Sequence, residues 1–320
     1  MNAFFKRTLA SSALAAGLFA GIASAQGDRG GPPEIVVHPT NPHGLGAAVT
    51  AGSTSTINPP IGFHGGPIMG IATPYLIWYG NWNQNNGSDT SAGQQIVRDF
   101  LHGLSGSNYY KTNASYSGVA PNGQVNPIGG ETTVGSPYGS SLTDAQIASV
   151  VTNAITSHAL PLDYAGVYFV LTSSNVNESS GFCTNYCGWH TYSTLGLGST
   201  QIKYSFVGNA NRCLSACAMQ STGPNGNAGV DGMVSVIAHE LEEANTDPQL
   251  NAWYNNRGSE SADMCAWTFG SHQFQSPNGA WANLTLPCAP GSSCTSRPYL
   301  IQRQLASNSK CYIDYPQRLQ

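Results

Sequence analysis

The stretch "GVDGMVSVIAHELEEANTDP", residues 229–248, combines a helical apolar pattern with a dense group of acidic side chains. Five apolar residues recur at helical spacing and predict a buried stripe: Met233, Val236, Ile237, Leu241 and Ala244. Asp231 is of a type favoured at helix N-caps, and Pro248 disfavours helix at the residue before it. The sequence therefore predicts a helix between these two residues.

The polar residues of this helix are expected to share one side of it. Residues four apart lie one turn apart on the same face, so His239 and Glu243 should project side by side. Glu240 borders that face, whereas Glu242 lies on another side and is expected to point to solvent. The pattern His-Glu-x-x-Glu is close to the HExxH motif, in which two residues at this spacing bind zinc and the glutamate acts as a base.

We therefore predict that His239 and Glu243 bind a divalent metal ion and that Glu240 is the catalytic base. A carboxylate oxygen is an accepted ligand of Zn2+, which is the favoured ion. The added negative charge also admits Mn2+ or Ca2+.

A further ligand has to come from outside the helix. The segment "GSESADMC" offers Glu260 and Asp263 at a distance comparable to that of the third acidic ligand in zinc peptidases of the thermolysin type. Either residue is expected to bind the ion or to orient the histidine. Asp247 and His190 are weaker candidates, because Pro248 makes the direction of Asp247 uncertain and His190 stands beside a cysteine-rich segment.

The competing interpretation is a solvated helix face, since acidic residues three and four apart are common there. Basic partners are scarce, however, because Arg212 is the only Lys or Arg between Lys203 and Arg257. Carboxylates beside a buried stripe need a partner. This scarcity favours a bound cation over surface salt bridges.

The rest of the chain alternates strand-like and helical segments. Apolar runs bounded by turn residues predict buried strands at residues 74–80, 165–173 and 202–210, and helical patterns occur at 91–106 and 142–160. We expect an α/β (α+β) fold, a single mixed-sheet domain over residues 61–320 with flanking helices and a zincin-like active-site helix. The C-terminal part should be turn-rich and stapled by disulfides.

The N-terminus has the features of an export signal. Lys6 and Arg7 precede an apolar run at residues 9–22, and "ASA" at 23–25 offers a small-x-small cleavage site. Residues 1–25 are therefore predicted to be a signal peptide, cleaved near Ala25 and followed by a Gly/Pro-rich lead-in over residues 26–60. The apolar run is shorter than the roughly 20 residues of a membrane span. We expect an extracellular or periplasmic protein with no stable membrane insertion.

Charge and cysteine content support export and exclude one class of partner. The net charge of −4 and the charged fraction of 9% provide no basic face for nucleic acid. The eight cysteines are even in number, as expected for disulfides in an oxidising compartment. The pairs in "CTNYC" and "CLSAC" could each close a small loop or pair with one another; their spacing argues against a zinc knuckle.

Several segments in order between residues 65 and 265 resemble the phosphate-induced protein 1 family, also called EXORDIUM-like. They are "GGPIMG", "LIWYGNWN", "IVRDFLHGLS", "VYFVLTSSNV", "GFCTNYCGWH", "FVGNANRCLSAC", "GVDGMV" and "TDPQLNAWY". The resemblance implies a secreted protein, because plant members reach the apoplast, are linked to growth and have no established enzymatic activity. Plant members lack the His-Glu-x-x-Glu residues, and this chain is more similar to a microbial form with a zincin-like HExxE motif.

Two functions from different classes are compatible with these features. The first is an exported metal-dependent hydrolase, a zinc peptidase that acts on peptide or protein substrates. The second is a non-catalytic extracellular protein acting at cell walls or surfaces, with any metal structural. In the second, exposed aromatic residues would stack on cell-wall polysaccharide, although such residues more often belong to the core; the candidates are Tyr109, Tyr110, Tyr116, Trp189, Trp253 and Trp281.

Overall fold

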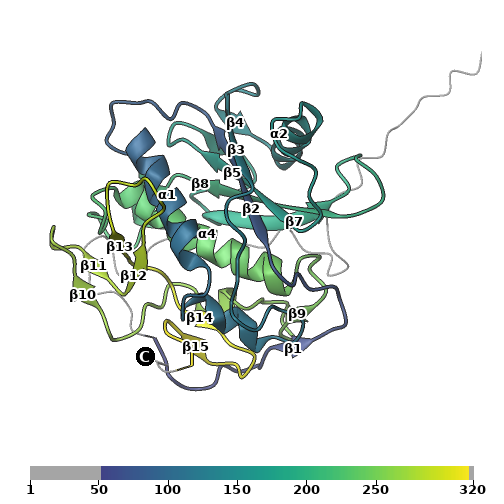
Figure 1. Ribbon diagram of the computed structural model, residues 1–320, viewed down its shortest axis with the longest axis vertical. Coiled ribbons are helices and arrows are strands. Elements are labelled where there is room, and N and C mark those ends of the chain that lie inside the picture. The colour runs from purple at the N-terminus through teal and green to yellow at the C-terminus, as the bar shows by residue number, and fades with distance from the viewer. Residues whose placement is uncertain (1–51, 317–320) are drawn as a thin grey trace, which may run out of the picture.

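The computed structural model describes residues 52–316, and its centre is a five-stranded mixed sheet (Figure 1). The strand order is β3-β2-β5-β8-β7. The bounds are β2 Thr73–Tyr79, β3 Gly130–Gly135, β5 Gly166–Thr172, β7 Gly188–Ser193 and β8 Ile202–Gly208. β2 pairs in parallel with β3 and β5, β5 pairs in parallel with β8, and β7 is antiparallel to β8. The predicted mixed sheet is confirmed.

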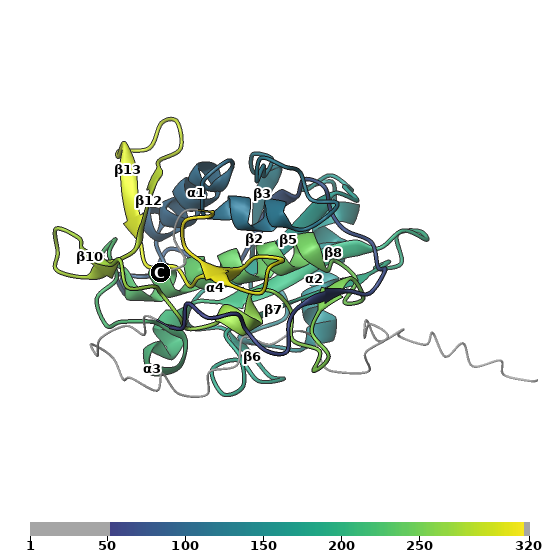
Figure 2. The ribbon, with the colours of Figure 1, turned by 90° about the horizontal axis from the view of Figure 1, so that it is seen from below.

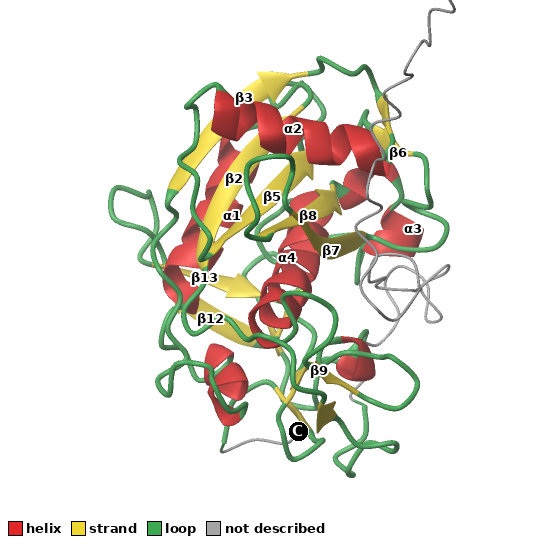
Figure 3. Cartoon of the chain, turned by 90° about the vertical axis from the view of Figure 1, so that its right-hand side faces the viewer, coloured by secondary structure: helices red, strands yellow, loops and turns green. Residues whose placement is uncertain are grey.

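The three central strands are buried on both faces, because every residue of β2, β5 and β8 is buried. Their sequences are continuous apolar and aromatic runs, as expected for parallel strands with helices on both sides. Helices α1 (Ser91–Leu104) and α4 (Ala228–Thr246) pack together on one face. Helix α2 (Asp144–Thr156) covers the other face (Figure 3).

Local sequence explains where these helices begin. The Thr90 side chain accepts a hydrogen bond from Gly93 N at the start of α1, and Thr143 forms a capping box with Gln146 at the start of α2. Helix α4 begins four residues earlier than predicted, because Asn227 rather than Asp231 is its N-cap and accepts from Val230 N. Asp231 lies instead in the first turn of α4.

Helix α4 is the most enclosed helix of the described chain, with every residue from Gly229 to Thr246 buried. The sheet covers one side of it through β7 and β8, and α1 covers another. The C-terminal segment, yellow in Figure 2, crosses it as well, where Gln302 N donates to Ser235 Oγ. A helix surrounded in this way has no solvent-facing side for its polar residues.

The remaining elements are short and connect the core to the turn-rich C-terminal part. Two-stranded ribbons form between β1 and β9, β4 and β6, β10 and β11, β12 and β13, and β14 and β15. Their bounds are β1 Gly62–Phe63, β4 Ser141–Leu142, β6 Asn177–Glu178, β9 Trp253–Tyr254, β10 Phe274–Gln275, β11 Trp281–Ala282, β12 Leu284–Pro287, β13 Ser296–Tyr299, β14 Gln304–Leu305 and β15 Cys311–Tyr312. The short helices are η1 Tyr110–Ser115, η2 Ala210–Arg212, α3 Leu214–Cys217 and η3 Asp263–Cys265.

All eight cysteines form disulfides: Cys183–Cys213, Cys187–Cys217, Cys265–Cys311 and Cys288–Cys294. The first two show that "CTNYC" and "CLSAC" pair with one another rather than closing two small loops. They join the segment that enters β7 to η2 and α3, just before α4. The predicted stapling is therefore confirmed.

The predicted signal peptide and residues 26–51 of the lead-in lie outside the described residues. Within residues 52–316, no helix has the length and apolar character needed to cross a membrane.

Candidate metal centre

The C-terminal half of α4 brings its histidine and one glutamate together as the sequence predicts. His239 Nε2 lies 3.0 Å from Glu243 Oε2, one helical turn away. The segment around η3 fixes the same carboxylate from the other side, because Glu243 Oε1 accepts from Ala262 N at 2.8 Å and from Asp263 N at 3.0 Å. One oxygen of Glu243 is thus held by backbone amides, and the other faces the imidazole.

Strand β7 adds a second histidine to this group. His190 Nδ1 lies 3.4 Å from Glu240 Oε2 and 3.9 Å from Glu243 Oε2. The close approach of β7 to α4 depends on Gly188, where a Cβ atom would lie 2.5 Å from Val236 and 3.2 Å from Glu240 Oε1. His190, a weaker candidate in the sequence, therefore belongs to the same cluster as His239 and Glu243.

Two sets of potential ligands share Glu243. In each set the donor atoms lie within 4.8 Å of one another; one set is His239, Glu240 and Glu243, and the other is His190, Glu243 and Glu260. Asp263 lies close as well, with Oδ1 3.7 Å from His239 Nε2. The structure thus brings Glu260 and Asp263 to the helix from a separate segment.

Asp247 stabilises the turn after α4 and is not one of the potential ligands. Its Oδ1 atom accepts hydrogen bonds from Asn251 N and Ala252 N, at 2.5 and 2.6 Å. These bonds shape the turn that follows α4, and neither set of potential ligands includes Asp247. Its carbonyl oxygen lies 3.5 Å from Nε2 of His190, so it helps to position that ring.

Gln302 orients His239 and was not identified from the sequence. Its Nε2 atom lies 2.8 Å from His239 Nδ1 and 3.3 Å from the carbonyl oxygen of Ala262. A contact on one ring nitrogen fixes which way the other nitrogen points, as is usual around metal-binding histidines. No local pattern could reveal Gln302, because it is 63 residues from His239 in the chain.

Burial is complete at the centre of this cluster. His190, His239, Glu240, Glu243 and Glu260 all have 0% exposure. Buried charges need compensation by partners, protons or metal ions. The cluster therefore has the composition of a site that holds either protons or a cation.

Glu242 corrects one prediction, since it is completely buried rather than solvated. Within residues 52–316, neither of its carboxylate oxygens makes a hydrogen bond. Burial, with a further contribution from Glu243, raises the pKa of Glu242 well above its usual range. The prediction failed because η1 packs against that side of α4, where Asn113 Nδ2 donates to the carbonyl oxygen of Glu242.

The distances in the cluster suit a divalent ion. Zn2+ binds nitrogen and oxygen donors at about 2.0–2.2 Å, so two ligands in a tetrahedral site lie roughly 3.4 Å apart. The separations of 3.0 Å between His239 and Glu243, 3.9 Å between His190 and Glu243, and 3.7 Å between His239 and Asp263 bracket that value. These residues therefore fit a mixed nitrogen and oxygen site.

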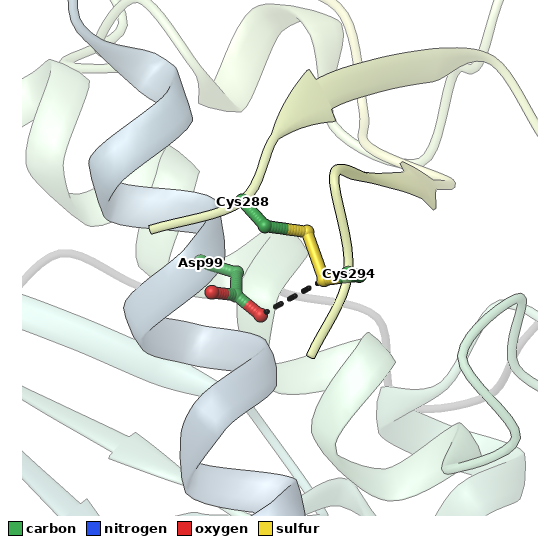
Figure 4. A group of neighbouring side chains, drawn as sticks. All are labelled: Asp99, Cys288 and Cys294. Carbon is green, nitrogen blue, oxygen red and sulfur yellow. Dashed lines mark hydrogen bonds between the residues drawn. A yellow bond between two sulfur atoms is a disulfide. The ribbon is translucent and has the colours of Figure 1, made fainter. Parts of the chain in front are cut away.

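A third group with metal-binding side chains does not fit an ion. Asp99, Cys288 and Cys294 lie together beside α1 (Figure 4), but the two cysteines are joined in a disulfide. Asp99 already accepts from Arg297 Nε at 2.6 Å and from Ala289 N at 3.0 Å. This carboxylate is fully engaged in holding the loop between the cysteines.

Most of the aromatic residues proposed to stack on sugars belong to the core, which was the alternative for each of them. Tyr109, Tyr110, Tyr116 and Trp189 are at most 1% exposed, Trp253 is half-buried, and only Trp281 is exposed, at 39%. Among residues 52–316, the exposed large apolar side chains are those of Phe63, Leu162, Tyr164, Phe274 and Trp281. Of the six candidates, Trp281 alone therefore has a ring exposed enough to stack on a sugar.

Comparisons with known proteins identify the family. The model of the phosphate-induced protein 1 conserved region matches residues 61–285. Protein EXORDIUM-like 3 of Arabidopsis thaliana is 30% identical over 276 residues, which cover 75% of this chain and 78% of that protein.

Two further relatives agree. Protein EXORDIUM-like 5 of Arabidopsis thaliana is 31% identical over 65% of this chain and 64% of its own length, which is less than two thirds. Protein PHOSPHATE-INDUCED 1 of Nicotiana tabacum is 29% identical over 63% of this chain and 71% of its own length. No solved structure matches the chain. The match over most of the mixed α/β domain shows that the chain belongs to the phosphate-induced protein 1 family, whose plant relatives carry the name EXORDIUM.

Proposed function

We propose that this chain is an exported, non-catalytic EXORDIUM-like protein that acts by binding at cell walls or surfaces. In this proposal the cluster on α4 holds one divalent cation, which stabilises the fold. The observation that carries it is the 0% exposure of His190, His239, Glu240, Glu243 and Glu260. A catalytic ion needs a coordination position open to substrate, whereas a structural ion is enclosed by protein ligands.

Each ligand has support from the contacts around it. His239 Nε2 and Glu243 Oε2 face one another, and Glu243 is fixed by two backbone amides. His190 Nδ1 approaches from β7, and Glu260 supplies an oxygen within 4.8 Å of both His190 and Glu243. Glu243 is common to the two sets, and the nitrogen and oxygen donors of either set favour Zn2+, with Mn2+ as the second choice.

Export is supported by the disulfides and by the relatives. Four disulfides use all eight cysteines, as is common outside the cytosol and rare within it. We assign residues 1–25 as a signal peptide cleaved near Ala25, because the basic, apolar and small-residue segments follow one another in the usual order. The HExxE helix marks a microbial form of the family.

The proposal is tested by assaying binding and hydrolysis on the same protein. Purified protein should sediment with insoluble cell-wall polysaccharide and should leave casein and peptide libraries uncleaved, with or without added Zn2+. Chelation should lower the unfolding temperature without altering any reaction. Peptide cleavage that disappears on chelation would contradict the non-catalytic assignment.

A metal-dependent hydrolase is the second candidate, and one contact favours it. Glu240 Oε2 lies 3.4 Å from His190 Nδ1, so a carboxylate next to the proposed ion is already paired with an imidazole. In a peptidase, Glu240 would accept a proton from the attacking water, and the cation would polarise the scissile carbonyl.

The two candidates differ in the effect of Glu240→Gln. A peptidase would lose nearly all turnover and keep its metal content, whereas a binding protein would have no turnover to lose. His190→Asn is assayed beside Glu240→Gln. It removes the imidazole that contacts Glu240, and it also removes a proposed metal ligand. Metal-dependent cleavage by the wild type that Glu240→Gln abolishes would establish the hydrolase.

A further inference from the structure

A polar groove lies away from α4, between the end of α1 and the C-terminal ribbons. It has a volume of about 580 Å³. One wall follows α1 and contains Ser105, Ser107 and Asn108; the other comes from the ribbons of β10 and β12, with Phe274 and Thr285. These segments lie side by side in Figure 1 although they are about 170 residues apart in the chain.

The lining of the groove has almost no charge. Among the described residues that form it, Asp314 is the only acidic one and none is Lys or Arg. Serine, threonine and asparagine side chains supply both donors and acceptors instead. With one carboxylate and one imidazole, Asp314 and His272, the lining offers no cluster of like charge for an ionic ligand and suits a neutral ligand with many hydroxyl groups.

The polar side chains of the α1 wall are held in place before any ligand binds. The hydroxyl of Ser105 accepts from Val125 N at 3.1 Å, and that of Ser107 accepts from Tyr110 N at 3.1 Å. Asn108 Oδ1 accepts from Lys111 Nζ at 3.0 Å. Each hydroxyl keeps its own proton to donate, and the Asn108 amide group can donate as well. Groups fixed in this way lose little freedom on binding.

Phe274 supplies the apolar part of the opposite wall. It is 42% exposed and belongs to the two-residue strand β10, which pairs with β11. An exposed ring beside hydroxyl and amide groups offers a flat apolar surface with hydrogen-bonding groups at its edge. The C–H face of a pyranose ring has the complementary shape and polarity.

We infer that this groove binds a neutral oligosaccharide of a few sugar rings, with one ring stacked on Phe274. The volume lies within the range of roughly 300–1,000 Å³ usual for small-ligand sites. The inference rests on the proposed function in one respect, the action at cell walls, and adds to it the binding site and the class of ligand. It is independent of the metal centre.

The test uses the full mature chain and soluble trisaccharides. Cellotriose, xylotriose, laminaritriose and mannotriose are titrated by calorimetry or NMR, with trigalacturonate as the acidic counterpart and a proline-rich peptide as the protein-like alternative. At least one neutral trisaccharide should bind, and Phe274→Ala should weaken that binding about tenfold. Thr285→Trp should block it, because Thr285 is exposed and its larger replacement fills the groove.

Phe63→Ala is the matched control. Phe63 is an exposed phenylalanine, at 52%, on the two-residue strand β1 outside the groove, so its loss should change affinity by less than about twofold. The inference is overturned if no neutral trisaccharide binds at about 10 mM, if only trigalacturonate or the peptide binds, or if Phe274→Ala binds like wild type. Sedimentation with insoluble walls separates the two proposals. If Thr285→Trp sediments with walls as fully as the wild type does, wall binding stands and the groove is excluded as its site.

Discussion

Two buried regions of this protein differ in the groups that surround their carboxylates. Beside α1, Asp99 accepts from the Arg297 guanidinium, from Gln95 and Ser292, and from the backbone of Ala289. Burial alone would raise the pKa of Asp99, but these bonds outweigh it and the pKa is lowered. Asp99 is therefore a stable anion at neutral pH.

Around α4 four glutamates are completely buried: Glu240, Glu242 and Glu243 belong to the helix, and Glu260 comes from the segment before η3. Histidines rather than arginines stand beside them, and burial raises the pKa of Glu242 well above its usual range. The comparison teaches that burial of an acid is not itself evidence of a metal site. The cluster on α4 differs because several potential metal-ligand atoms lie close to one another. The Asp99 carboxylate is instead surrounded by hydrogen-bond donors.

Removing the Asp99 carboxylate should cause the largest loss of unfolding free energy. Asp99→Ala leaves the Arg297 side chain, which is 18% exposed, without its carboxylate and releases the backbone of Ala289. Removing one partner of a buried ion pair costs about 3–5 kcal/mol of unfolding free energy. Urea denaturation measures it, and a cost below about 1 kcal/mol would show that the network is not stabilising.

Removing a bound ion should lower the unfolding free energy somewhat less than Asp99→Ala does. Chelation is expected to lower the unfolding free energy of the wild type by about 3 kcal/mol, the value for an ion present at roughly 100 times its dissociation constant. Glu243→Gln should be insensitive to chelation, because it loses the carboxylate that faces His239. Glu131→Gln, a change at a half-exposed carboxylate on β3, is the control and should respond like the wild type. Equal responses of wild type and Glu243→Gln would contradict the site.

Asp231 is another buried carboxylate, and its effect can be measured from how the unfolding free energy changes with pH. Burial raises the pKa of Asp231 from 3.8 to about 7, although hydrogen bonds from Asn225 counteract it. The folded protein therefore binds a proton that the unfolded chain has released, so stability falls as the pH rises from about 4 to about 7. Asp231→Asn should remove the share of Asp231 in that fall, about 3 kcal/mol across this window, and leave the share of Glu242, whose pKa is also raised.

The measurement is urea denaturation at several pH values for wild type and Asp231→Asn. Identical slopes in the two proteins between pH 4 and 7 would show that Asp231 is not the group that titrates. Asp99 provides the contrast, because its lowered pKa makes the stability it contributes disappear only when the pH falls into the acid range.

The surface ion pair Arg98–Glu131 should show the smallest effect. Its atoms are 2.9 Å apart, but the side chains are 25% and 39% exposed. Exposed pairs contribute about 0.2–1 kcal/mol, so Glu131→Gln should cost less than about 1 kcal/mol. A larger loss would point to the additional bond from Trp78 Nε1 to Glu131 rather than to the ion pair.

The sequence predicted those parts of the centre that depend on local geometry. His239 and Glu243 meet because helical periodicity places residues four apart on one face. The buried strands β2, β5 and β8 were recognised as apolar runs between turn residues. These features need no knowledge of distant contacts.

Other features depend on contacts between distant segments, so the sequence indicated them only weakly, as for His190, or not at all. His190 reaches the centre because β7 is the antiparallel edge strand and Gly188 lets it approach α4. Glu242 is buried because tyrosine-rich sequence around η1, itself expected to be exposed, covers its side of the helix. Gln302 contacts His239 from the C-terminal segment.

The most direct test of the buried centre on α4 is elemental analysis of the purified mature protein. We expect about one divalent transition-metal ion per chain in the wild type, and loss of that ion in His239→Ala, because a site built on this imidazole and Glu243 cannot keep its ion without it. Circular dichroism should confirm that the variant is folded. A metal-free wild type that stays folded, or a folded His239→Ala protein with the same metal content, would contradict the assignment.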